Sequence, residues 1–103
     1  MNIVVLVTAK DALEAKTIAD QLLEKKLIAC ANIVEGAQSI FWWQGKIDQA
    51  KETLIVLKSK QGLFKKIVKM IKAHHSYEVP EIIALPIIDG NPDYLKWINE
   101  SVG

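Results

Sequence analysis

The sequence predicts an α+β fold, and three observations carry that prediction. Four apolar runs rich in β-branched residues are typical of strands. Two segments between these runs repeat apolar residues at helical spacing, and a shorter helical segment follows the last run. The resulting order, strand, helix, strand, strand, helix, strand, helix, favours one antiparallel sheet with its two main helices on one face.

The chain opens with a strand and a helix. Residues 3–7 form a continuous apolar run, which predicts a strand that is central in its sheet or covered on both faces. Asp11 and Glu14 resemble a helix-capping box, with Asp in place of Ser or Thr. The amphipathic helix predicted after them has about four turns. Its apolar positions are Ala12, Ala15, Ile18, Ala19 and Leu22.

A long hairpin follows this helix. Residues 27–34 predict the second strand, and residues 35–36 (Glu-Gly) interrupt it, which indicates a bulge. The strand resumes over residues 37–43, and the Gln-Gly pair at 44–45 turns the chain. The third strand then covers residues 46–57.

Two tryptophans lie at the tip of this hairpin. Neighbouring strand residues point to opposite faces, so Trp42 and Trp43 cannot share one core. We expect one to face the domain interior and the other to face solvent or a partner. Single exposed apolar residues are common, but large exposed patches are rare on monomers, so we favour a subunit contact at the hairpin.

The second half of the chain again contains an amphipathic helix followed by a strand. Phe64, Ile67, Val68 and Ile71 predict the second helix. A connector at 74–81 follows it. The lysines predicted to lie on the outer face of this helix or just before it are Lys58, Lys60, Lys65, Lys66, Lys69 and Lys72.

The fourth strand is predicted at residues 82–88. It should end or lie at an edge at Pro86, which has no N–H to donate. Asn91 and Pro92 have the types favoured at the N-cap and first position of a helix. Tyr94, Leu95, Trp97 and Ile98 are expected to form this short terminal helix.

These elements form a ferredoxin-like βαββαβ domain over residues 1–103, extended by a terminal helix. The helices of such a domain cover one face of the sheet. Consecutive apolar residues at 54–57 and 82–83 indicate that both faces require burial. A homo-oligomer whose sheets pack on one another satisfies both faces.

Composition limits the functional classes. The chain is 50% hydrophobic and 24% charged, as globular proteins are. Its net charge of +1 gives no bulk attraction to nucleic acid or membranes. Cys30 is the only cysteine, so no intrachain disulfide forms, and no apolar span or signal peptide is evident. We therefore expect a soluble cytoplasmic protein.

Three parts of the chain carry a recognisable pattern: LIACANIVEG at 27–36 leading into SIFWWQGKI at 39–47, HSYEVPE at 75–81, and GNPDYLKW at 90–97. Their order and spacing resemble the CutA divalent-cation tolerance family over nearly the whole chain. The resemblance implies a ferredoxin-like fold, a tight homotrimer, cytoplasmic copper-related biology and a trimer architecture like that of PII signalling proteins.

Two positions depart from the family pattern. Ser76 stands where many members have proline, which is expected to loosen the backbone beside the histidines. Val7 stands where some bacterial members carry a cysteine that binds copper together with the two histidines. The chain thus lacks one soft ligand of that type of copper site.

His74 and His75 are the leading candidate metal ligands, because imidazole binds copper, nickel and zinc well. Alternatively, both interact with the negative C-terminal end of the helix dipole. Cys30 is a secondary candidate, or simply a small buried residue. Glu78 or Glu81 is the nearby carboxylate that could complete a site.

No nucleophile of the chain has a recognisable base or triad context, so we expect no enzymatic activity. The first hypothesis is a trimer that contributes to divalent-cation tolerance by binding copper or another divalent cation weakly. The alternative is a PII-like signalling or scaffold trimer that binds an anionic small molecule or a protein partner in clefts between subunits. That alternative rests on the lysine-rich helix face, which otherwise is a solvated surface.

Overall fold

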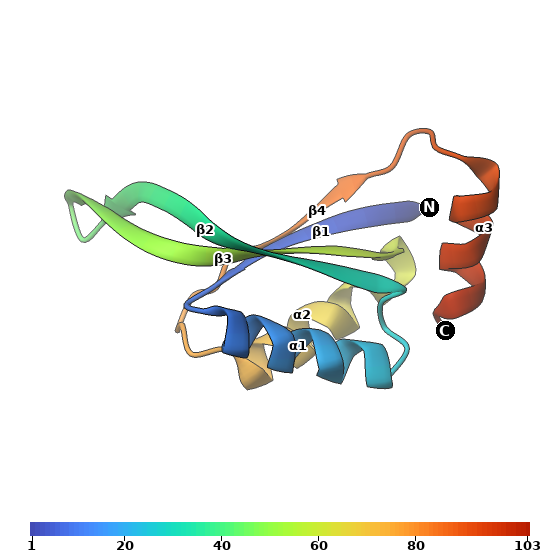
Figure 1. Ribbon diagram of the computed structural model, residues 1–103, viewed down its shortest axis with the longest axis horizontal. Coiled ribbons are helices and arrows are strands. Elements are labelled where there is room, and N and C mark those ends of the chain that lie inside the picture. Colours follow the sequence, from blue (N-terminus) through green and yellow to red (C-terminus); the bar gives the residue numbers. More distant parts are fainter.

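The predicted order of elements is confirmed. The computed structural model describes all 103 residues. Its elements are β1 (Asn2–Ala9), α1 (Ala12–Glu24), β2 (Cys30–Trp43), β3 (Lys46–Lys60), the 3₁₀ helix η1 (Gln61–Leu63), α2 (Phe64–His74), β4 (Ile82–Pro86) and α3 (Pro92–Ser101). Neighbouring strands are antiparallel, in the order β2-β3-β1-β4. Figure 1 shows α1 and α2 beneath one face of the sheet and α3 at its end, near the N-terminus.

The core lies between the sheet and these two helices. Every second residue of β1 is buried, so one face of this strand packs on α1 and α2. The small Ala15 lets α1 approach the sheet closely, and α2 contributes Ile67 and Ile71. The thirteen buried residues of this cluster are Ile3, Val5, Val7, Ala9, Ala15, Ile18, Leu22, Leu27, Ile28, Ile55, Leu57, Ile67 and Ile71.

The other face of the sheet, here called the open face, is also apolar. Leu6 lies between Val56 and Ile83 in the register of the three adjacent strands. Ile83 and Leu85 of β4 are 48% and 47% exposed. The prediction that both faces are apolar is therefore confirmed, and within one chain α1 and α2 cover only one of them.

The β2–β3 hairpin extends beyond the helices as an arm, the green end of the sheet in Figure 1. Its register shifts between Val34 and Ala37, where Gly36 has a φ of 82°, so the predicted bulge is confirmed. Trp42 and Trp43 are 73% and 53% exposed. The expectation that one of them faces the interior is wrong, because the arm extends past the core and no helix covers either of its faces.

Several element boundaries differ from prediction, and β3, for example, continues to Lys60 rather than ending at residue 57. β2 begins at Cys30 rather than at residue 27, although Leu27 and Ile28 are buried. Leu27 instead accepts a hydrogen bond through its carbonyl from the Ser59 hydroxyl, 2.6 Å away. β4 ends at Pro86 and is an edge strand, as the missing N–H requires. None of the helices combines the length and apolarity needed to cross a membrane.

Candidate functional site

A groove of about 700 Å³ lies between the arm and the connector at 74–81. Its lining includes four carboxylates and no lysine, arginine or histidine, so its electrostatic potential favours cations. Phe41 and Trp43 add aromatic surface from the arm. The lining residues are Thr8, Ser39, Ile40, Phe41, Trp43, Asp48, Ala50, Glu52, Tyr77, Glu78, Val79 and Glu81.

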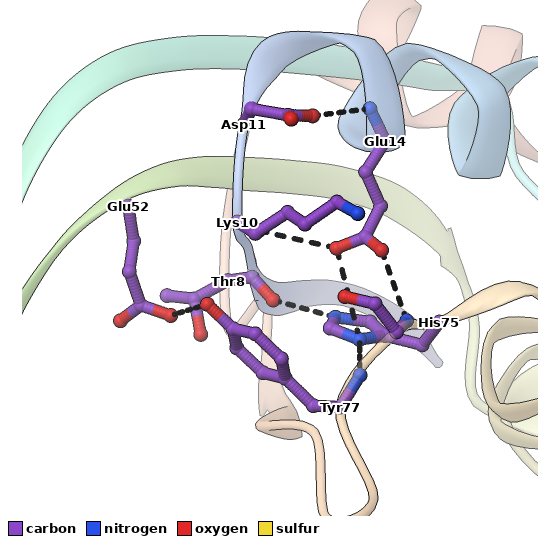
Figure 2. A network of polar contacts seen from close by, with 8 residues as sticks. Thr8, Lys10, Asp11, Glu14, Glu52, His75 and Tyr77 are labelled. Carbon is purple, nitrogen blue, oxygen red and sulfur yellow. Dashed lines mark hydrogen bonds and ion pairs between the residues drawn. The ribbon is translucent and has the colours of Figure 1, made fainter.

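One hydrogen bond joins the connector to the arm across the inner part of this groove. The Tyr77 hydroxyl donates to Oε2 of Glu52 over 2.8 Å, as Figure 2 shows. Glu52 is only 9% exposed, and its buried carboxylate is thereby paired. Burial and the neighbouring Glu52 raise the pKa of Tyr77 to about 12. The phenol is therefore a protonated donor at neutral pH and does not act as a base there.

The side chain of His75, a residue of the connector, is fully buried. One ring nitrogen, Nε2, is 2.8 Å from the Thr8 carbonyl oxygen, which accepts only, so Nε2 carries the proton. The other nitrogen, Nδ1, accepts the Tyr77 N–H over 3.0 Å. Both nitrogens of His75 are thus engaged (Figure 2), and in this arrangement neither has a free lone pair for a metal ion.

Glu14 anchors the connector to α1. Asp11 caps the helix by accepting the Glu14 N–H over 2.8 Å, as predicted. The Glu14 carboxylate accepts the Lys10 N–H over 3.1 Å and the Ser76 N–H over 2.9 Å (Figure 2). Burial alone would raise the pKa of Glu14, but these hydrogen bonds, a further one from the Ser76 side chain and nearby His75 together lower it.

The capping-box pattern therefore located Glu14 on α1 but did not reveal its contact with the connector. That contact spans 62 positions of the chain. Ser76 was expected to loosen the backbone at this point, and in the structure its N–H donates to the Glu14 carboxylate. A proline at this position has no N–H to donate.

The candidate ligands lie in different parts of the chain. His74 is the last residue of α2 and is exposed, and Glu78 lines the groove. Cys30 lies on the open face, with its Sγ 3.6 Å from the Tyr94 hydroxyl.

Cys30 is distant from the connector within one chain. It pairs with Lys58, whereas Thr8, the partner of His75, pairs with Leu54, four residues away along β3. That separation is about 13 Å at ~3.3 Å per residue. No group of three or more His, Cys, Asp or Glu side chains lies together in a way that could hold a metal ion.

The chain matches the CutA1 divalent ion tolerance protein family over residues 3–101. A divalent-cation tolerance protein CutA of Thermus thermophilus is 46% identical over 103 residues, which are 100% of both chains. The chloroplastic protein CutA 1 of Oryza sativa is 42% identical over 97% of this chain. The chain spans only 56% of the length of that rice protein.

Solved structures agree with these sequence matches. The Cut A1 structure from Thermus thermophilus superposes with a TM-score of 0.98 at 46% identity, over 100% of each chain. A structure from Archaeoglobus fulgidus, described as a periplasmic divalent cation tolerance protein CutA, gives 0.96 at 43% identity over 100% of each chain. The chain therefore belongs to the CutA1 divalent ion tolerance protein family.

Proposed function

We propose that this chain contributes to divalent-cation tolerance by binding copper, or another divalent cation, weakly at the connector. The observation that carries the proposal is the charge of the groove beside it, which has four carboxylates and no cationic side chain in its lining. The names of the relatives supply the class of ion, a divalent cation. This conclusion concerns binding, and we propose no catalytic role.

Within this proposal the accessible ligands are His74 and Glu78, which are both exposed. His75 joins them only if the Tyr77 N–H leaves its Nδ1 atom. Cys30 joins them only from a neighbouring subunit, because of its distance from the connector in one chain. Such a partial ligand set predicts weak binding that is selective for ions with a preference for imidazole.

The test is a titration of copper(II) against tryptophan fluorescence, since Trp43 lines the groove. We expect His74→Ala to weaken binding and Lys72→Ala, which changes an exposed residue of the same helical turn, to leave it intact. Competition with zinc and magnesium ranks the ions. Equal copper affinity in wild type, His74→Ala and His75→Ala would exclude the connector as the site.

We further propose that the functional unit is a homotrimer. The open face leaves Ile83 and Leu85 about half exposed, and the arm adds Ile40, Trp42 and Ile47, each at least 67% exposed. Surfaces of this kind rarely stay uncovered on a monomer. Sedimentation should give about 35 kDa, three times the chain mass of 11.5 kDa. A mass of one chain would contradict the trimer, and Ile83→Glu should shift the mass toward that value.

We place this activity in the cytoplasm, because Cys30 is a free, half-buried thiol, as is typical of reducing compartments. Fluorescence microscopy of a tagged chain tests this placement. Signal confined to a membrane fraction or to the periplasm would contradict it.

The alternative, a PII-like trimer that binds an anion, rests on the exposed lysines of α2. These lysines are absent from the lining of the groove, whose carboxylates repel anions. A thermal-shift screen discriminates the two functions, because a ligand that binds the native state raises its Tm. A shift with nucleotides or other anions and none with copper would favour the alternative.

A further inference from the structure

The connector is fixed to the body of the fold through one carboxylate. The Glu14 side chain is only 8% exposed. It accepts hydrogen bonds from the Lys10 N–H and the Ser76 N–H. Its Oε1 atom is also 3.8 Å from Nδ1 of His75. A single side chain thus joins the β1–α1 turn, the first turn of α1 and the start of the connector (Figure 2).

The contact between Glu14 and Ser76 lies just after the point where the chain changes from helix to extended backbone. α2 ends at His74, and His75 adopts an extended backbone with φ −95° and ψ 140°. Ser76 comes next, and Tyr77, Glu78 and Glu81 then form a wall of the groove. The Glu14–Ser76 contact therefore fixes the residue from which the connector leaves the helix.

We propose that Glu14 is a positioning residue for the connector: its contact with Ser76, here called the latch, sets the placement of the flanking His74 and Glu78. The latch acts through Ser76, since Glu14 does not line the groove. The consequence for metal affinity rests on the function proposed above. Hydrogen bonds to a carboxylate are stronger than neutral ones, which suits them to hold an otherwise irregular segment.

Three substitutions separate the parts of the latch. Glu14→Gln keeps the shape of the side chain but turns one end of it into a donor, which cannot accept an N–H. Ser76→Ala removes the hydroxyl and keeps the N–H. Ser76→Pro removes both donors, and the ψ of 140° at His75 already suits a residue that precedes proline.

The first measurement is amide hydrogen exchange in the metal-free protein. The Tyr77 N–H, bonded to His75, reports opening of the connector. The Leu95 N–H, bonded to the Asn91 carbonyl at the start of α3, reports a local opening that leaves the latch intact. We expect Glu14→Gln to accelerate exchange at Tyr77 roughly tenfold, the size expected for one lost charge-assisted hydrogen bond, with Leu95 unchanged. Ser76→Ala should have a smaller effect. In a Ser76→Pro background, Glu14→Gln should add nothing.

Exchange that rises equally at Tyr77 and Leu95 would overturn the latch, because Glu14→Gln would then loosen parts of the fold that the latch does not hold. Unchanged exchange at Tyr77 would overturn it as well. A full effect of Glu14→Gln in the Ser76→Pro background would show that Glu14 acts through another contact, which also contradicts the proposal.

The second measurement is copper(II) affinity. We expect Glu14→Gln to weaken it roughly tenfold, because the metal-free connector then no longer holds His74 and Glu78 in their binding placement, and to lower Tm at neutral pH. Asp20→Asn is the matched control, an exposed carboxylate of the same helix that pairs with Lys16. Wild-type copper affinity in Glu14→Gln, despite faster exchange at Tyr77, would overturn the positioning role. If wild type binds no copper, the proposed function fails, and the exchange data alone decide whether the latch exists.

Discussion

The hydrogen bond between Tyr77 and Glu52 allows a sharp test of what holds the groove together. Tyr77→Phe removes one oxygen atom and leaves the 9% exposed Glu52 carboxylate without the donor at 2.8 Å. A hydrogen bond to a charged group contributes about 1.5–3 kcal/mol, and the carboxylate also loses compensation for its burial. We therefore expect the free energy of unfolding to fall by about 2 kcal/mol at neutral pH.

Urea unfolding followed by tryptophan fluorescence measures this change, at one fixed protomer concentration so that assembly does not alter the comparison. Tyr94→Phe is the matched control, because the Tyr94 hydroxyl has only the Cys30 sulfur at 3.6 Å as a partner. It should change the free energy of unfolding by no more than about 0.5 kcal/mol. Equal values for the two variants would refute a special contribution from the Tyr77–Glu52 bond.

The pH dependence adds an independent check. The folded-state pKa of Tyr77 is raised from 10.0 to about 12, so the fold favours the protonated phenol. Its contribution to stability is complete below pH 10 and is lost as the pH rises toward 12. The stability difference between wild type and Tyr77→Phe should therefore shrink over that interval. A constant difference would contradict the assignment of the raised pKa to this contact.

Three other predictions follow from the same structure. Ile67→Ala should cost about 2–5 kcal/mol in urea unfolding because Ile67 is fully buried, whereas Leu13→Ala, at a 75% exposed position, should cost under about 0.5. Glu14 has a lowered pKa, so its stabilisation is present above its usual value of 4.5 and is lost as the pH falls below it; Glu14→Gln should flatten the acid limb of stability measured by circular dichroism. Gly36→Ala should cost about 1–2 kcal/mol in urea unfolding, because a side chain at a φ of 82° is strained, and no change would contradict that reason.

Periodicity in the sequence was sufficient to predict the fold because the core depends on it. Alternate residues of β1 are buried, and α2 buries residues at i and i+4, as the apolar pattern required. Turn chemistry located the bulge at Gly36 and the reversal at Gly45, both with positive φ. The order of the strands then followed from right-handed connections.

The position of the tryptophan pair was not predictable in the same way. Alternation shows that Trp42 and Trp43 face opposite sides, but it contains no information on how far the helices extend beneath the hairpin. That extent depends on the 13 residues of α1 and the 11 of α2 relative to strands of 14 and 15 residues. Since a helix rises about 1.5 Å per residue and a strand about 3.3 Å, these two strands are longer than the helices and extend past their ends. The comparison of element lengths was the available signal for an uncovered arm.

The candidate site was the least predictable part, for a reason specific to histidine. The sequence reveals that His74 and His75 are adjacent, but a ligand requires a free nitrogen, which depends on distant partners. Thr8 occupies one nitrogen of His75, 67 positions away, and the Tyr77 N–H occupies the other. The adjacent His74 ends the helix exposed. The two neighbouring histidines therefore differ in role. His75, together with Glu14, holds the connector in place, whereas the groups accessible to an ion there are His74 and the carboxylates of the groove.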